Sequence, residues 1–231
     1  MIDVVHEIQT FNAGRDPDRL ALKYKGMRSS PFVFLRGTCH LFYQRLPNLP
    51  LLAEAPPVWS CGDLHLQNFG SYKGDNRLVY FDVNDFDESA LAPASWDLLR
   101  FLTSVLVGAE AMHVKGKDVT ELSDAFLDAY RATLAAGKAG WIERETAGGL
   151  VKDLLDGLHG RLRPDFLDGR TELKGKRRHL RLDNGKALPA SDDQRERVTK
   201  LIGELAESRQ NPDFYEVLDV ARRIAGSGSL G

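Results

Sequence analysis

The sequence predicts an α+β fold that is mainly helical and carries one short β-hairpin. Apolar residues recur at helical spacing in several segments, and residues 118–136 give a clear stripe of this kind. Two short apolar runs, at about 58–61 and 77–82, have the length of strands, and the polar residues 71–77 give a turn signal between them. A chain of 231 residues with 42% hydrophobic content is long enough for one large or two small domains.

Helices are expected to fill the chain up to the first strand. Residues 2–26 are typical of one or two short helices, with a break around Gly14 to Pro17. Pro31 is expected to open an apolar-rich helix that runs to about Leu46, because proline is tolerated in the first turn of a helix. The prolines between residues 47 and 57 then mark a loop.

Further helices are expected after the strands. The residues from Pro93 on begin a long helix from Trp96 to about His113, and another helix is expected near 147–158. Residues 191–209 are typical of an exposed helix, because Ser191 is a good N-cap and acidic residues follow it at the positive end of the helix dipole.

Composition excludes several classes of protein. A net charge of −2 gives no general reason to expect nucleic-acid or membrane partners. The basic stretch 161–181 lacks interleaved aromatic residues for base stacking, so a solvated loop is the preferred interpretation over a phosphate or RNA site. Cys39 and Cys61 are too few for a disulfide framework and are expected to be buried. With neither a transmembrane run nor a secretion signal, a cytoplasmic location is expected. The three tryptophans are expected in the core.

The stretch from Gly62 to Gly70 is the most informative part of the chain. Asp63 and Asn68 stand five residues apart after one apolar run, and the next run ends in the acidic residues from Asp82 onward. A kinase has this layout: its catalytic-loop aspartate accepts the proton of a substrate hydroxyl, and an asparagine and a later aspartate hold magnesium ions on the nucleotide phosphates. Asp and Asn also favour ordinary turns, but here the pair is joined to an acidic strand end. The pattern predicts phosphotransfer that uses ATP and Mg²⁺.

At these residues the chain resembles the bacterial "domain of unknown function 2252" family. The blocks that carry the resemblance are Gly62–Gly70, Asn84–Glu88 and Trp96–Leu98, with further blocks at Ser30–Gly37 and Asp219–Gly231. The similarity runs from about residue 20 to the last residue and is loose over 115–210. By analogy the resemblance implies a protein-kinase-like fold, similar to aminoglycoside and choline kinase-like phosphotransferases, with a helical C-lobe that carries the catalytic loops on the hairpin 58–87.

The resemblance also implies roles for single residues. Asp63 is expected to act as the catalytic base, and His65 is expected to orient the loop through a hydrogen bond. Asn68 is expected to bind magnesium. Asp97 is expected to brace the catalytic loop rather than to touch the substrate.

The second metal ligand is left open between two aspartates. Its position at the end of the strand favours Asp82, whereas the Asp-Phe dipeptide and the twelve-residue spacing to the aspartate of the next helix favour Asp85. Asp85 is preferred, and Asp87 is a candidate to assist either. Arg36 and Arg100 are expected to pair with this acidic cluster, because unpaired buried charge is costly.

The last residues contain a glycine loop, Gly226-x-Gly228-x-x-Gly231, that fits a phosphate-binding pattern. In the resembled family such a loop precedes a strand pair that bears a lysine, as in a kinase N-lobe, and here the chain stops at the loop. We therefore expect a C-terminally truncated chain with an incomplete N-lobe: a helical domain over 1–210 and the start of a nucleotide-binding segment over 211–231.

Three functions remain at this stage. The first is a kinase-like phosphotransferase that uses ATP and Mg²⁺ and acts on an unknown small-molecule or protein hydroxyl, inactive as this fragment. The second is a non-catalytic kinase-like binding or regulatory module. The third is a metal-dependent phosphoesterase, for which the Asp63-Leu64-His65 triplet would supply ligands, although such enzymes usually need more histidines than the six scattered here.

Overall fold

The computed structural model describes residues 3–182 and 185–224, and these divide between His159 and Gly160 into two compact units. The N-terminal unit holds the predicted catalytic loop, and the C-terminal unit begins at Gly160. The predicted glycine loop, with Gly226, Gly228 and Gly231, lies outside the described residues.

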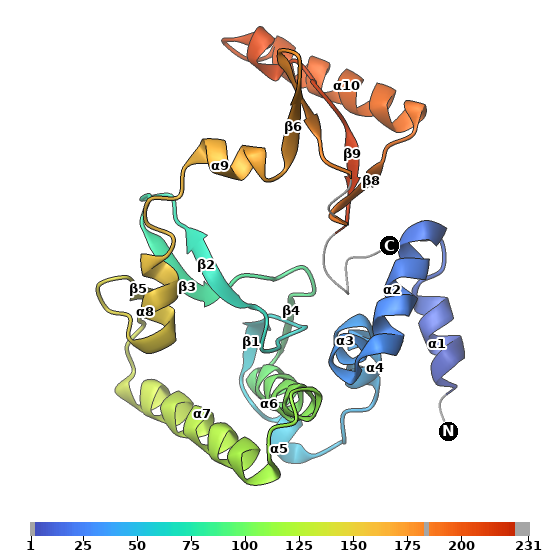
Figure 1. The fold of residues 1–231 in the computed structure, drawn as a ribbon. Coiled ribbons are helices and arrows are strands. Elements are labelled where there is room, and N and C mark those ends of the chain that lie inside the picture. The colour runs from blue at the N-terminus through green and yellow to red at the C-terminus, as the bar shows by residue number, and fades with distance from the viewer. Residues whose placement is uncertain (1–2, 183–184, 225–231) are drawn as a thin grey trace. The chain divides into compact units, whose positions relative to one another are not determined.

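The N-terminal unit begins with two short helices, α1 (Val4–Phe11) and α2 (Pro17–Ser29), as the sequence predicts (Figure 1). Asp3 and Asp16 cap them by accepting hydrogen bonds from backbone N–H groups of the first turns. The next predicted helix is interrupted: α3 (Pro31–Gly37) and α4 (Cys39–Gln44) are separated at Thr38, whose backbone leaves the helical region.

The predicted pairing of the first two strands is wrong. The strand β1 (Pro57–Ser60), which follows the one-turn helix α5 (Pro50–Ala53), pairs with β4 (Ala90–Pro93). The hairpin is formed instead by β2 (Phe69–Lys73) and β3 (Val79–Val83), and the short β5 (Ile142–Glu143) extends it.

The reason for this difference lies in residues 71–73. They belong to the strand, and Tyr72 pairs across the hairpin with Tyr80 at 5.7 Å between ring centroids. The turn is therefore shorter than predicted, with a hydrogen bond from the N–H of Gly74 to the carbonyl of Leu78 at 2.9 Å. The predicted catalytic loop consequently lies before the hairpin, between β1 and β2.

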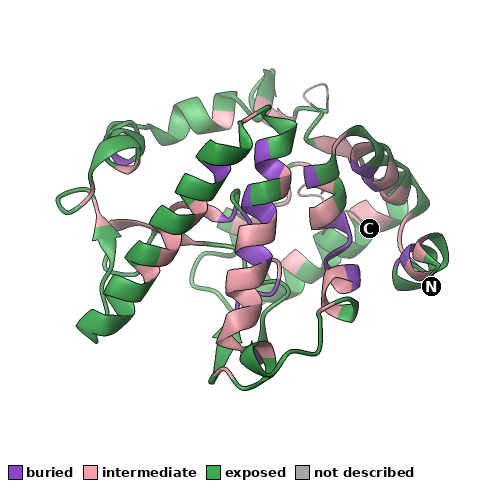
Figure 2. Ribbon diagram, turned by 90° about the horizontal axis from the view of Figure 1, so that it is seen from below, coloured by how far each residue is buried: buried purple, intermediate pink, exposed green. Residues whose placement is uncertain are grey.

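Three helices follow the strands in the predicted places, namely α6 (Ala94–Ala111), α7 (Gly116–Ala136) and α8 (Gly149–Asp156). The buried residues of α6 lie along one side of the helix, as Figure 2 shows. That side forms one core cluster with Val119 of α7, and α1, α2 and α4 form another. The first consists of Phe101, Val105, Ala109 and Val119, and the second of Ile8, Met27 and Leu41.

The prediction that the tryptophans lie in the core is wrong for two of them. Trp59 and Trp141 are 77% and 65% exposed. Trp59 belongs to the two-stranded, antiparallel β1–β4 sheet. Such a sheet often packs against the core with one face and leaves the other face in contact with solvent. The two cysteines are buried and free, as expected.

The C-terminal unit consists of short elements and one longer helix. The longer helix, α10 (Asp192–Glu207), begins at Ser191 with a capping box that includes Gln194, as the predicted N-cap requires. Two antiparallel pairs, β6 with β7 and β8 with β9, make up its strands. The elements are α9 (Arg163–Asp168), β6 (Thr171–Lys174), β7 (Arg177–Leu180), β8 (Ala187–Pro189), the 3₁₀ turn η1 (Pro212–Tyr215) and β9 (Ala221–Arg223).

The basic stretch 161–181 is ordered rather than a loop, because it contains α9 and the β6–β7 hairpin. Arg177 pairs with Glu216 at 3.2 Å and Arg178 with Asp168 at 2.7 Å. Its charges are therefore partly balanced by carboxylates of the same unit.

The division into units differs from the expected boundary between residues 210 and 211. Segments on both sides of that point belong to one unit, because β8 pairs with β9 and Arg195 forms an ion pair with Asp219 at 2.9 Å. Across the residues that the structure describes, no helix combines the length and the apolar character needed to cross a bilayer.

Candidate active site

Gly62 anchors the segment that we call the Asp63 loop, residues 61–68. Its backbone has a φ of +88°, and a Cβ at this position would lie 2.1 Å from the carbonyl oxygen of Glu88. The carbonyl of Gly62 accepts hydrogen bonds from the Tyr43 hydroxyl and, at 3.7 Å, from the Cys39 thiol. Only glycine fits here, and its conformation fixes the direction in which the loop leaves β1.

One side of α6 holds the rest of the loop through residues spaced at helical intervals. Asp97 accepts hydrogen bonds from the N–H groups of the first two loop residues, at 2.7 and 3.2 Å. One turn later Arg100 binds Asp63, and after another turn the hydroxyl of Ser104 accepts from the N–H of Leu66 at 3.2 Å. The expectation that Asp97 braces the loop is confirmed, and it is the first member of a stripe that extends through Ser104.

Asp63 forms a buried ion pair with Arg100, as expected for that arginine. The Nε of Arg100 donates to Oδ1 of Asp63 at 3.1 Å, and its Nη2 donates both to the same oxygen and to the carbonyl of Leu35. The guanidinium of Arg100 is fully buried and lies over the ring of Phe42, 4.9 Å from its centroid. One oxygen of Asp63 is therefore fixed by the helix.

Within residues 3–182 and 185–224, the second oxygen of Asp63 accepts no hydrogen bond. Oδ2 lies 3.9 Å from Nε2 of His65, and the Asp63 side chain retains 15% of its exposure. Burial raises the pKa of Asp63, although the charge of Arg100 opposes this shift. A partly desolvated carboxylate with one free oxygen and a raised pKa is a better proton acceptor than an exposed aspartate.

His65 is a neutral, buried histidine in the middle of the loop. Its Nδ1 accepts a hydrogen bond from the N–H of Gln67 at 3.1 Å, so in the neutral ring Nε2 carries the hydrogen and faces Asp63. Burial lowers the pKa of His65 to about 3, and the charges of Arg36 and Arg100 act in the same direction. The expected hydrogen bond that orients the loop is present.

The neutrality of His65 predicts a loss of stability in acid. The unfolded chain takes up a proton on this residue near pH 6.5 and the folded chain only near pH 3, so acidification between these values favours unfolding. All three tryptophans lie in the N-terminal unit, and their fluorescence reports its unfolding in urea. We expect His65→Asn, which keeps an acceptor for Gln67, to flatten the fall in urea midpoint between pH 7 and pH 4. The same substitution at the exposed His6 is the control, and an unchanged slope in His65→Asn would contradict the prediction.

Asn68 closes the loop from within. Its Oδ1 accepts a hydrogen bond from the N–H of His65 at 2.9 Å, and the side chain is 2% exposed. An amide oxygen has a second lone pair, so this bond leaves capacity for one further partner. The carbonyl of Asn68 accepts from the N–H of Asn84 at 3.0 Å, which continues the β2–β3 ladder by one residue. This bond brings residues 82–87, which we call the acidic segment, beside the loop.

The two candidate metal ligands in the acidic segment differ in their surroundings. Asp82 is exposed, and its Oδ1 accepts from the N–H of its neighbour Val83 at 2.7 Å. Asp85 is also exposed, but its charge acts on both Arg36 and Cys61, which border Asp63, and its carbonyl accepts from the Cys61 thiol at 2.8 Å. This difference favours Asp85.

Two residues of the site carried no role in the sequence prediction. The carbonyl of Glu88 lies against Gly62, and its carboxylate contributes to the raised pKa of Asp63. Tyr43 holds the loop through its hydroxyl, and burial raises the pKa of this phenol. Glu88 follows the acidic segment directly in the sequence, whereas nothing in the pattern around Tyr43 distinguishes it from a core residue.

The donors present fit a magnesium ion that is shared with a phosphate. No group of three or more His, Cys, Asp or Glu side chains suited to a metal occurs within residues 3–182 and 185–224. Magnesium usually binds one or two carboxylates and takes its remaining ligands from phosphates and water, and Asp85 and Asn68 are oxygen donors of the types that it accepts. A metal pair held entirely by the protein needs more ligands than these.

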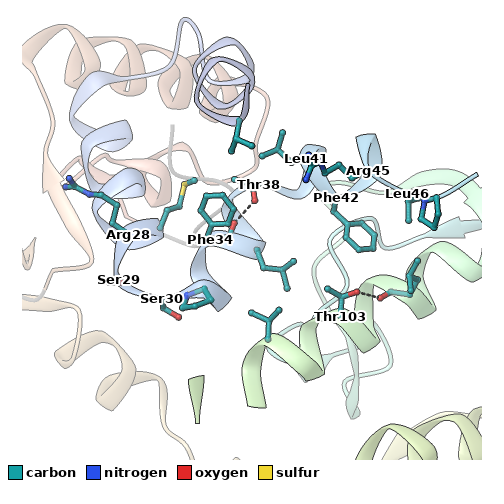
Figure 3. Close-up of a pocket in the computed structure, with 17 residues that line it drawn as sticks. Arg28, Ser29, Ser30, Phe34, Thr38, Leu41, Phe42, Arg45, Leu46 and Thr103 are labelled. Carbon is teal, nitrogen blue, oxygen red and sulfur yellow. Dashed lines mark hydrogen bonds between the residues drawn. The ribbon is translucent and has the colours of Figure 1, made fainter. Parts of the chain in front are cut away.

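A large apolar cavity of about 810 Å³ lies beside the site but does not contain it (Figure 3). Leu35 and Phe42, which hold Arg100, are among the residues that line it, whereas Asp63, Asn68 and Asp85 are not. The hydroxyls of two threonines in its wall donate to backbone carbonyls, as the dashed lines in Figure 3 show. The cavity offers little polar chemistry, and the reacting groups lie on the Asp63 loop.

Comparison with known proteins identifies a family for nearly the whole chain. Residues 15–231 match the family model described as "Uncharacterized protein conserved in bacteria (DUF2252)". No curated protein and no solved structure matches the chain. The matched region includes the Asp63 loop, the acidic segment and α6, and the chain therefore belongs to the DUF2252 family of bacterial proteins.

Proposed function

We propose that this protein is a kinase-like phosphotransferase in which Asp63 receives the proton of an acceptor hydroxyl. The observation that carries the proposal is the difference between the two oxygens of its carboxylate: Arg100 binds Oδ1, while Oδ2 accepts no hydrogen bond from the residues that the structure describes. Asp97 and Ser104 hold the backbone of the loop on both sides of Asp63. A carboxylate that only balanced the charge of Arg100 would not require this support. The position of Asp85 beside this loop supports the same function.

The order of the parts agrees with the resemblance to aminoglycoside and choline kinase-like enzymes. A loop with Asp63 and Asn68 comes first, the β2–β3 hairpin and Asp85 follow, and a helix opened by Asp97 completes the set. In phosphoryl transfer, catalysis comes mainly from positioning and from stabilisation of charge. A rigid loop with one free carboxylate oxygen suits that task.

Each residue has one part in the proposed mechanism. Asp63 takes the proton of the hydroxyl as this oxygen attacks the terminal phosphorus of ATP, and the bond to the bridging oxygen breaks so that ADP leaves. The Nε2–H of neutral His65 faces the carboxylate at 3.9 Å. Asp85 and Asn68 would hold magnesium, which supplies positive charge to the nucleotide phosphates. The acceptor is a small molecule or a protein side chain that presents a hydroxyl, and the nucleotide is ATP.

Replacing Asp63 by asparagine tests this role. The amide oxygen still accepts from Arg100, which keeps the hydrogen bond but not the counter-charge, so some loss of stability is expected. The amide group no longer accepts a proton. We expect the natural gene product with Asp63→Asn to bind ATP as before and to transfer phosphate to water at least 100-fold more slowly, since positioned bases contribute about 10²–10⁴-fold. Release of phosphate from ATP is the readout because it needs no knowledge of the acceptor.

The outcomes separate the three functions. Unchanged phosphate release in Asp63→Asn overturns the proposed role of this residue. ATP binding without turnover in the unmodified protein points to a non-catalytic binding module. Turnover of phosphate esters without any affinity for ATP points to a phosphoesterase, which the donor set of the described residues does not favour.

A further inference from the structure

Arg36 is a half-buried arginine whose donors are largely unused. It lies in the last turn of α3, and its Nη1 donates to Oε1 of Gln67 in the Asp63 loop at 2.6 Å. Within the described residues, its Nε is buried without a hydrogen-bond partner. Arg100 also has one such atom, Nη1, but its Nε and Nη2 donate to Asp63 and to the carbonyl of Leu35.

Arg36 lies within the electrostatic influence of the acidic residues of the site. Burial lowers the pKa of Arg36, and the charges of Asp63 and Asp85 oppose this shift. Within residues 3–182 and 185–224 Arg36 forms no ion pair, so the expectation that it pairs with the acidic cluster is wrong in this respect. The bond to Gln67 holds the guanidinium beside the carboxylates instead of on them.

Nη1 of Arg36 is engaged by Gln67, so within the described residues Nε and Nη2 are the donors of its guanidinium that form no hydrogen bond. The planar fork of an arginine matches the oxygens of a phosphate group and binds them with two parallel hydrogen bonds. A simple anion would be repelled by Asp63 and Asp85, whereas the phosphate of a magnesium nucleotide brings its own compensating charge. Acidic residues, which would hold the magnesium ion, and an arginine, which would bind the phosphate, are present around the same loop.

We propose that Arg36 binds the terminal phosphate of the nucleotide and aligns it with Asp63. The inference rests on the proposed function, since it names the residue that holds the group to be transferred. Gln67 is the positioning residue: it sets the guanidinium in place and ties it to the loop that carries the base.

Calorimetric titration of the natural gene product with ATP, ADP, AMP and inorganic phosphate tests the inference. We expect Arg36→Gln to weaken ATP binding at least tenfold, to weaken ADP binding less, and to leave AMP binding unchanged. Arg36→Lys keeps the charge without the fork, and we expect an intermediate loss. Arg45→Gln is the matched control, because Arg45 is an exposed arginine of the same unit that has no place in the site.

The failures of the two proposals are distinguishable. If the unmodified protein binds magnesium ATP and Arg36→Gln binds it equally well, the inference is overturned and the proposed function stands. If Arg36 matters for inorganic phosphate but not for ATP, the arginine serves an anionic acceptor, and the assignment to the nucleotide is overturned. If the unmodified protein binds none of the four ligands, both proposals fail.

Discussion

Replacing Asp63 by alanine is expected to lower the free energy of unfolding of the N-terminal unit by about 3–5 kcal/mol. The substitution leaves Arg100 charged and fully buried, and among the residues that the structure describes its remaining partners are the carbonyl of Leu35 and the ring of Phe42. Taking a charge out of water without a counter-charge is costly, and the cost appears when one partner of a buried pair is removed. Urea unfolding followed by tryptophan fluorescence measures it.

A double substitution and a surface pair make this result interpretable. Combining Asp63→Ala with Arg100→Met removes both charges, and we expect it to recover most of the lost stability, because apolar replacements of buried pairs are often neutral. Asp128→Ala breaks the exposed pair with Arg131 on α7 and is expected to change stability by less than about 0.5 kcal/mol. A single Asp63→Ala variant as stable as Asp128→Ala would contradict the buried pair.

Replacing Gly62 by alanine is expected to displace the Asp63 loop and to abolish phosphate release from ATP. The added Cβ would meet the backbone of Glu88 at 2.1 Å, far closer than van der Waals contact, and the φ of +88° is unfavourable for a residue with a side chain. The backbone strain alone costs about 1–3 kcal/mol. Because Glu88 meets the methyl group with its backbone, the clash is relieved only by moving the loop or the turn that precedes β4.

Gly137→Ala separates the clash from the strain. Gly137 ends α7 with a φ of +62°, and a Cβ there would have no neighbour within 4 Å. We expect this control to lose only the stability that a left-handed backbone costs and to keep full activity. Equal effects of the two substitutions on unfolding and on phosphate release would show that the contact with Glu88 is unimportant.

Local patterns in the sequence predict most of the helices and miss one strand pairing. The stripe over 118–136 and the N-cap at Ser191 are local signals, and the structure has α7 and α10 there. The partner of β1 is not a local property. It depends on β4, thirty residues further along the chain, and the residues between the two strands contain a hairpin of their own.

For the site, too, the sequence predicts what depends on local pattern and misses contacts between residues that are far apart in the chain. The residues of the Asp63 loop and the acidic segment stand out in the sequence because their chemistry is unusual for a turn. Arg100 and Ser104 are spaced at helical intervals from Asp97, so their place on one side of α6 follows from the sequence once that helix is assigned. The role of Tyr43 depends on contact with a glycine carbonyl 19 residues away, which no local pattern records.

Calorimetric titration of the natural gene product with ATP, with and without magnesium, tests the proposed function most directly. We expect ATP to bind in the presence of magnesium, and we expect the magnesium-dependent part of its affinity to be lost in Asp85→Ala. Failure of the protein to bind ATP under both conditions would contradict the proposal and leave the Asp63 loop as a structural element.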